Sequence, residues 1–185
     1  MSLFEFVTVM VSMILALCLG HLLRGVTFLA KTDRPVEYYL PHTLWSIEIL
    51  LAVVNHWWSL WDLRDVNWSY ASFLYILVAP ILVSLATGLL APTQSSAGPI
   101  DLQAHFGRIR RMFAVVMVAY TSFMWFDGPL FAGQAVFGPV GLMHIPIIAA
   151  CAVPGVTKSY RANLIAPGSV IVALVTVMIL RYSAS

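Results

Sequence analysis

The stretch FEFVTVMVSMILALCLGHLL, residues 4–23, decides the class of the fold. Its only charged side chain is Glu5, and nearly all its other residues are apolar. A helix of about 20 apolar residues is long enough to cross a bilayer core of roughly 30 Å. Lipid offers no partner for free backbone groups, so such a stretch must be helical. Because no basic residue precedes it, we expect a permanent membrane span rather than a cleaved signal peptide.

Similar apolar stretches recur along the rest of the chain. Loop residues such as Pro, Gly, Asp and Asn separate them, as at Asp127-Gly128-Pro129. We therefore predict an all-α integral membrane protein with a single domain of six transmembrane helices. The expected spans cover residues 4–23, 43–61, 71–90, 112–126, 134–153 and 163–180.

The composition of the chain supports this class. Its 185 residues are 61% hydrophobic and only 10% charged, whereas soluble domains carry roughly 25% charged residues. A water-soluble fold is therefore excluded, and so is a disordered chain, which needs low hydrophobicity. The formal net charge of +2 is too small to indicate nucleic-acid binding.

Basic residues predict how the helices are oriented, because Lys and Arg concentrate in cytoplasmic loops. Only Arg64 and Arg181 fall on the side that carries the termini. The other basic residues lie in the first, third and fifth loops: Arg24, Lys31, Arg34, Arg108, Arg110, Arg111, Lys158 and Arg161. We therefore expect both termini outside the cytoplasm.

The third loop, residues 91–111, is the longest. Residues 91–99 have the composition of a flexible linker, and residues 101–111 are typical of a short helix with Asp101 near its start. This helix either lies along the inner leaflet or extends the fourth span into the cytoplasm. We expect His42 and His105 to be loop residues without a functional role.

A polar stripe marks the second span. At 100° per residue, Glu48, Asn55, Ser59 and Asp62 fall within a band about 80° wide, and His56 flanks the band. Polar side chains are costly in hydrocarbon, so this face must meet other helices, a water-filled path or a second subunit. On the fifth span, His144 is expected at a depth within about one turn of His56.

The polar groups also have purely structural interpretations. Glu48 can be a protonated carboxyl bonded to a neighbouring helix, and His56 and His144 can be neutral imidazoles that donate to backbone carbonyls. The fifth span is expected to be irregular around Gly138-Pro139 and Pro146, either as a broken helix that lines a site or as a simple kink.

Phe4-Glu5-Phe6-Val7, Gly20-His21-Leu22-Leu23, Trp45 and Asn55-His56-Trp57-Trp58 followed by Trp61 give the chain a resemblance to a known group. Over its first three helices the chain is similar to uncharacterised multi-pass inner-membrane proteins of bacteria. The resemblance implies a six-helix integral protein of the bacterial inner membrane, and it implies no established activity.

Three functions are open at this point. The first is a channel or secondary transporter for a small ion or solute. It would act as a homo-oligomer or as a subunit of a membrane complex. Its path would use Glu48, Asn55, His56, Ser59, Asp62 and His144. The second is a redox protein that handles quinone or binds b-type haem between His56 and His144. The third is a structural, partner-binding subunit. No catalytic or metal-binding motif is present, so we expect no enzyme.

Overall fold

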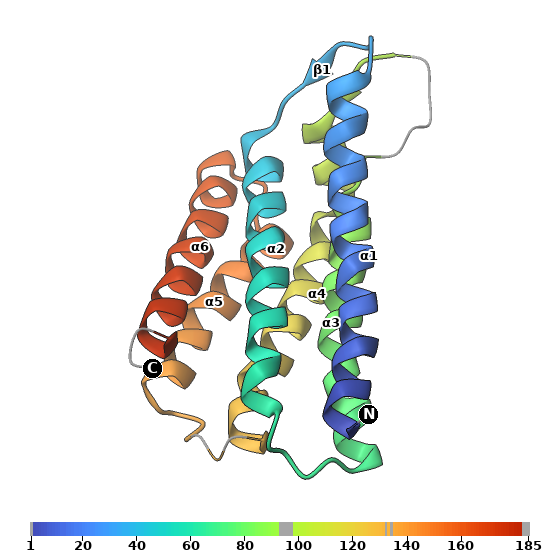
Figure 1. The fold of residues 1–185 in the computed structure, drawn as a ribbon. Coiled ribbons are helices and arrows are strands. Elements are labelled where there is room, and N and C mark those ends of the chain that lie inside the picture. Colours follow the sequence, from blue (N-terminus) through green and yellow to red (C-terminus); the bar gives the residue numbers. More distant parts are fainter. Residues whose placement is uncertain (1, 93–97, 132, 134, 183–185) are drawn as a thin grey trace.

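The computed structural model describes residues 2–92, 98–131, 133 and 135–182. Residues 93–97 of the predicted linker lie outside this part, as does Gln134, where we expected the fifth span to begin. Long helices dominate the described chain (Figure 1). In chain order the elements are α1 (Leu3–Lys31), β1 (Val36–Glu37), α2 (Leu40–Ser59), η1 (Leu60–Leu63), α3 (Tyr70–Leu90), β2 (Ile100–Asp101), α4 (Leu102–Phe131), α5 (Pro139–Val156) and α6 (Tyr160–Tyr182).

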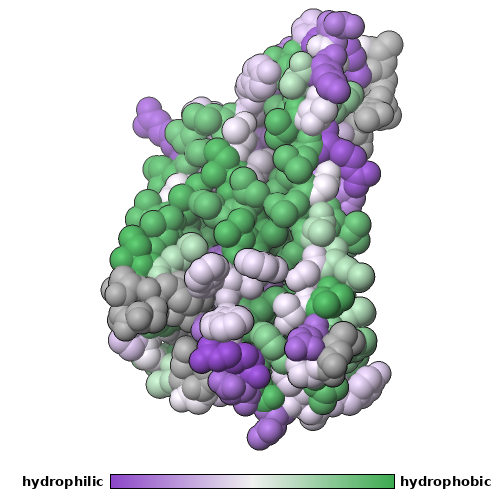
Figure 2. Space-filling model, in the orientation of Figure 1, coloured by the Kyte–Doolittle hydropathy of each residue, from purple (hydrophilic) through white to green (hydrophobic). Residues whose placement is uncertain are grey.

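Each expected span corresponds to one helix of the bundle. Five helices, α1, α3, α4, α5 and α6, are long and apolar enough to cross a membrane. On the face shown in Figure 2, hydrophobic side chains cover the middle of the molecule and hydrophilic ones gather towards its two ends. The exposed apolar residues match lipid rather than water. The fold is therefore a helical membrane bundle.

The second helix, α2, is the polar exception. His42, Glu48 and His56 lower its apolar content, and all three are buried. The helix contacts α1, α3, α4 and α6, so its polar side chains are covered by protein. Figure 1 shows α2 in the middle of the bundle, between α6 and α1. Burial against other helices is what allows this sequence to lie in a membrane bundle.

The start of α1 and the end of α6 lie at the same end of the bundle (Figure 1). The connection after η1 and the end of α4 lie at this end too. The opposite end carries β1 and β2, which pair in parallel with Val36 opposite Ile100. Arg34 Nε donates to Gly98 O at 2.6 Å beside this pair. The chain passes from one end of the bundle to the other an even number of times, so it returns to the end at which it starts.

Helix α4 corrects one predicted loop. Asp127-Gly128-Pro129 has turn composition, yet these residues belong to the last turns of the helix. The aromatic rings of Trp68 and Tyr75 pack on Phe131 at 6.1 and 5.7 Å between centroids, which holds the end of the helix in place. At its other end α4 includes residues 102–111, so this segment is continuous with the fourth span. Asp101 Oδ1 accepts from Ala104 N at that start.

Helix α5 corrects a second expectation. The helix begins at Pro139 with Gly138 as its N-cap, so this proline does not interrupt it. Proline is favoured in the first turn of a helix, where its missing N–H has no helical partner to lose. Pro146 and Pro154 do lie inside α5.

Two histidines that we expected in loops are buried helical residues. His42 Nε2 contacts Leu90 O at 2.8 Å, and His105 Nε2 contacts Leu89 O at 3.1 Å. These carbonyls belong to the last turn of α3, where no helical N–H is left to satisfy them. His42 and His105 therefore cap α3, and the loop expectation was wrong.

Arg110 fixes the junction between α4 and α5. Its side chain is buried, and Nη1 donates to Pro154 O at 2.7 Å and to Gly155 O at 3.2 Å. A cation beside the last carbonyls of a helix also complements the helix dipole. This contact joins the end of α5 to the start of the predicted span in α4.

Replacing Arg110 by Ala should lower the free energy of unfolding by about 1–3 kcal/mol, because buried carbonyls at the end of α5 lose a charged donor. Thermal unfolding of the detergent-purified variant, followed by circular dichroism, measures the loss. Arg111→Ala is the matched control, since it removes the same charge from an exposed neighbouring position. Equal midpoints for the two variants would contradict this role of Arg110.

Candidate functional site

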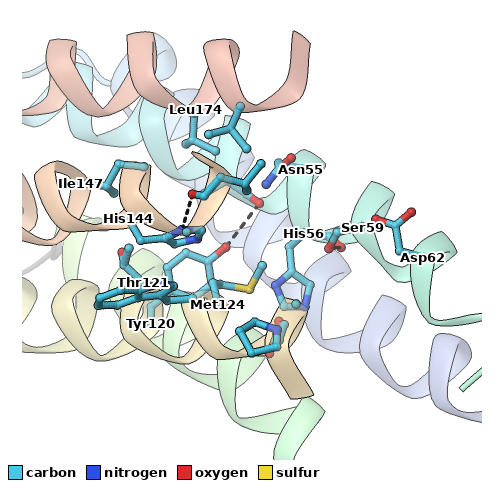
Figure 3. Close-up of a pocket in the computed structure, with 18 of the residues that line it drawn as sticks. Asn55, His56, Ser59, Asp62, Tyr120, Thr121, Met124, His144, Ile147 and Leu174 are labelled. Carbon is cyan, nitrogen blue, oxygen red and sulfur yellow. Dashed lines mark hydrogen bonds between the residues drawn. The ribbon is translucent and has the colours of Figure 1, made fainter. Parts of the chain in front are cut away.

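A cavity of about 90 Å³ lies inside the bundle, between α2 and the helices α4, α5 and α6. Figure 3 shows Asn55, His56 and Ser59 along α2 and Asp62 in η1, which follows it, with Tyr120 and His144 on neighbouring helices. Every residue predicted for the path lines this cavity: Glu48, Asn55, His56, Ser59, Asp62 and His144. From Glu48 to Asp62 the stripe extends about 21 Å along the helix.

The wall opposite the stripe comes from α4, which runs alongside α2 in the same direction. Trp45 packs edge-to-face on Phe113 with 5.2 Å between ring centroids. Two turns further, Tyr120 Oη donates to Ala52 O at 3.5 Å. The sequence offset is the same in both pairs, so the helices keep their register through the level of Glu48.

Glu48 is the most deeply buried acid of the described chain, with 2% of its surface exposed. Its Oε2 atom is buried and has no hydrogen-bond partner among the described residues. The structural interpretation requires a carboxyl that bonds to a neighbouring helix. The Oε2 atom does not support it. An ionised carboxylate without a partner is costly away from bulk water, so a proton or a cation must neutralise it.

His56 lies two turns along α2 from Glu48 and is 1% exposed. Neither Nδ1 nor Nε2 has a hydrogen-bond partner among the described residues. The ring stacks on Tyr120, with 6.3 Å between centroids and 28° between planes. His42 and His105 differ, because each has a ring nitrogen on a backbone carbonyl. Both nitrogens of His56 are therefore buried hydrogen-bonding atoms that no described residue satisfies.

His144 has a structural partner on its own helix. Its Nδ1 donates to Val140 O at 3.1 Å, as the structural interpretation of this residue requires. The imidazole stacks almost parallel to Trp125, with 6.3 Å between centroids and 4° between planes. These contacts hold the ring in the cavity wall. His144 therefore shapes the cavity and is less available for proton exchange at Nδ1.

The end of the cavity nearest Asp62 lies where α2, η1 and α4 end. Ser59 Oγ donates to His56 O at 2.8 Å, and Asp62 and Asp127 line this end. Trp125 Nε1 donates to Val136 O at 3.0 Å, which ties the segment before α5 to α4.

Gly141 allows this segment to lie close to α5. A Cβ atom at Gly141 would clash with the carbonyl of Val136, so only glycine fits there. Gly141 also lines the cavity. Larger residues would push the segment away from the wall that it completes.

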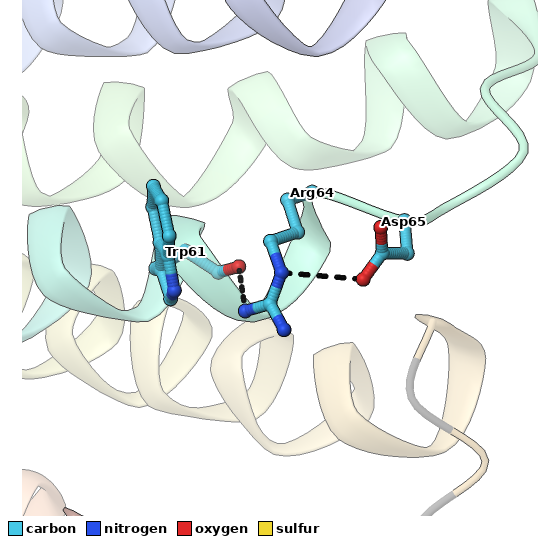
Figure 4. Close-up of polar contacts among 3 residues, drawn as sticks. All are labelled: Trp61, Arg64 and Asp65. Atoms are coloured by element: carbon cyan, nitrogen blue, oxygen red, sulfur yellow. Dashed lines mark hydrogen bonds and ion pairs between the residues drawn. The ribbon is translucent and has the colours of Figure 1, made fainter.

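Arg64, at the same end of the bundle, does not line the cavity. Its Nε pairs with Asp65 Oδ2 at 3.2 Å, and its guanidinium lies 5.3 Å from the centre of the Trp61 ring (Figure 4). The Arg64 and Asp65 side chains are both well exposed. The positive charge is therefore held at the surface of the bundle.

Beyond Glu48 the cavity ends against apolar side chains. Trp45, Ile49, Phe113 and Met117 are each 0% exposed. The side chains of Trp45 and Phe113 pack directly against each other. The cavity is therefore lined by polar groups towards Asp62 and ends in a packed layer on the other side of Glu48.

A second cavity, of about 280 Å³, lies nearer the other end of the bundle. It is lined by residues of α1, α2, α3 and the start of α4, including His21 and His42. His21 and Glu48 therefore line different cavities. Ser46 lines this second cavity and Glu48 lines the first, so the two cavities meet different faces of α2.

Sequence reasoning missed the contribution of α4. Tyr120, Thr121, Trp125 and Asp127 all line the first cavity. Thr121 Oγ1 donates to Met117 O at 2.9 Å, so its hydroxyl is satisfied within the helix. A lone Tyr among apolar residues gives no stripe, and Asp127 had been assigned to a loop. The spacing of Phe113 and Tyr120, two turns apart, is the signal that could have revealed this face.

No protein-family model, curated protein or solved structure matches the chain.

Water access to the cavity predicts a gradient of cysteine reactivity along α2. Ser59→Cys should react quickly with a small charged methanethiosulfonate and Asn55→Cys more slowly, because Asn55 lies one turn deeper. Val54→Cys, on a face that is 46% exposed outside the cavity, should not react in liposomes, because thiolates do not form in lipid. Mass spectrometry of the protein measures the modification.

The native thiols give little background in this experiment, because Cys18 and Cys151 are both buried. The wild-type protein measures what background there is. Equal reaction rates at residues 54, 55 and 59 would show that the stripe does not face a water-accessible cavity.

Proposed function

We propose that this protein is a small-ion transporter, that the cavity along α2 is its binding site, and that Glu48 is the group that takes up the ion or a coupled proton. One observation carries the proposal. The Glu48 carboxyl is buried with Oε2 unpartnered among the described residues, and it lines a cavity that follows a polar stripe to the end of the bundle. An intramembrane acid of this kind indicates a functional site.

The closed end of the cavity favours a carrier over a continuous pore. Trp45, Ile49 and Phe113 are fully buried beyond Glu48, and Trp45 packs directly on Phe113. A carrier exposes its site to one side at a time, and its other side is closed by packed side chains. The arrangement corresponds to a state that is open towards Asp62.

The haem alternative has less support. His56 and His144 line one cavity, as a ligand pair requires, but the cavity measures about 90 Å³. Pockets for drug-sized ligands usually hold about 300–1,000 Å³, and haem belongs to that class of size. Binding haem would therefore require the helices to separate. The partner-binding alternative leaves the unpartnered groups of Glu48 and His56 without a role.

We also propose a membrane topology. In it, α2 also crosses the membrane, which brings the number of spans to six, and both termini face away from the cytoplasm in a bacterial inner membrane. The predicted excess of Lys and Arg in the odd-numbered loops supports this orientation. Assembly into a homo-oligomer or a larger membrane complex stays a prediction.

The proposal predicts that Glu48→Gln lowers ion flux into proteoliposomes at least tenfold, because the amide neither takes up a proton nor balances a cation. Flux of protons, Na⁺ and K⁺ is measured separately with enclosed fluorescent dyes. The matched control is Glu5→Gln, the same substitution in an exposed capping box at the start of α1. Gln also serves in capping boxes, so this control should transport normally.

Both variants should give the same elution profile in detergent as the wild-type protein. Undiminished flux in Glu48→Gln would remove the proposal. Equal losses in Glu48→Gln and Glu5→Gln would also contradict it, because the effect would then not belong to the cavity.

A further inference from the structure

The charges of the cavity wall restrict the transported species. Glu48, Asp62 and Asp127 line the cavity, whereas no Lys or Arg belongs to its described lining. At the end of the bundle that is nearest to the cavity, Arg64 lies at the surface and pairs with Asp65 (Figure 4). A wall with carboxylates and without fixed positive charge attracts cations and repels anions.

The size of the cavity restricts the species further. A volume of about 90 Å³ gives room for several water molecules, since one water needs about 10–15 Å³ of such space. Organic solutes need larger pockets. The candidates are therefore a proton or a small inorganic cation.

The oxygen atoms of the wall are not gathered as a metal site requires. Within the described residues, no group of three or more His, Cys, Asp or Glu side chains could hold a metal ion. The hydroxyls of Ser59 and Thr121 donate to carbonyls of their own helices. A hard cation needs several oxygens around one point, and the wall instead spreads its polar groups along the helix.

Polar groups that are spread along the helix suit the transfer of a proton. Glu48, Ala52 and His56 follow one another at intervals of one turn, about 6 Å along α2. Tyr120 Oη reaches the middle position through its 3.5 Å hydrogen bond to Ala52 O. Glu48 and His56 themselves lie about 12 Å apart along α2, so Tyr120 Oη or more than one bridging water molecule must connect the two groups. The titratable groups thus form a row with room for water between them.

His56 has the chemistry of a proton relay. An imidazole can take up a proton on one nitrogen and release another from its second nitrogen, provided that neither is fixed by a backbone partner. Both nitrogens of His56 lack a partner among the described residues. In His42, His105 and His144 a backbone carbonyl holds one nitrogen. His56 is therefore the histidine of the cavity that is able to exchange protons at both nitrogens.

We infer that the transported ion is the proton, and that it passes by way of water from the Asp62 end through His56 to Glu48. A proton from water binds one nitrogen of His56, and the proton on the other nitrogen leaves through water or Tyr120 Oη to the Glu48 carboxylate. The net result is one proton moved from the cavity mouth to Glu48, with no redox change. This inference rests on the proposed transport function.

Other titratable groups face the relay from the surrounding helices. Helix α4 contributes Tyr120 and Asp127, and α5 contributes His144. Cys151 of α5 is buried nearby and contacts Thr121 at 3.7 Å. Helices α3 and α6 contribute only apolar side chains to the described lining, namely Ile76, Leu174 and Val177. Asp127 is thus the acid that accompanies Asp62 at the mouth.

The test uses proteoliposomes with an enclosed pH dye and a membrane potential set by K⁺ and valinomycin, in choline medium without Na⁺. Wild-type protein should change the internal pH under these conditions. His56→Gln should lower the rate at least tenfold, because the amide cannot exchange protons. His105→Gln is the matched control at a capping position outside the cavity, and its rate should stay at the wild-type level.

A second arm separates this inference from the proposed function and does not depend on the His56 variant. Wild-type protein that carries Na⁺ or K⁺ in a Glu48-dependent way, without moving protons, would overturn the proton relay and leave the transporter intact. Proton flux at the wild-type rate in His56→Gln would also overturn the relay. Absence of any flux in wild type would overturn both.

Discussion

The structure depends on the burial of one polar helix among apolar ones. Helix α2 carries Glu48 and His56 into the middle of the bundle, and neither can face lipid without a large cost in free energy. The bundle covers α2 with α1, α3, α4 and α6. The exposed side of α2 carries apolar side chains such as Val54, and its polar groups Glu48 and His56 are buried, so the arrangement follows from which surfaces tolerate hydrocarbon.

The way α2 is covered decides where the cavity forms. Towards β1 and β2, large side chains such as Trp45 and Phe113 fill the space between α2 and α4. Towards Asp62, smaller or polar side chains such as Ala52, Ser59 and Gly141 leave space open. The register of α2 against α4 is constant, but the side chains between them become smaller towards Asp62. This change in size produces a cavity that is closed at one end.

Polar groups in this bundle divide into satisfied and unsatisfied ones. His42, His105 and Arg110 cap helix ends, where carbonyls lack helical donors. Glu48 lies in the middle of α2 and His56 in its last turn, and both carry buried atoms that no described residue satisfies. Both residues line the cavity, and this combination of lining and unpartnered atoms separates them from the capping residues.

The lengths of the apolar stretches in the sequence made the number of helices and their approximate bounds predictable. The polar stripe likewise placed Glu48, Asn55, Ser59 and Asp62 on one face, because helical periodicity fixes which side chains share a face. Sequence could not show that Tyr120 and Asp127 complete the cavity, since the register of α4 against α2 depends on packing. Local composition also misled at Pro129 and His42, where tertiary contacts hold residues in helices.

The most direct test of the central claim is infrared difference spectroscopy of the purified protein during a pH titration. If Glu48 is a water-accessible proton-binding group, a carboxylic-acid C=O band should grow as the pH falls and should shift in D₂O. The band should be missing in Glu48→Gln and present in Glu5→Gln. A spectrum in which Glu48→Gln matches wild type, or a Glu48 band that does not respond to D₂O, would contradict the account.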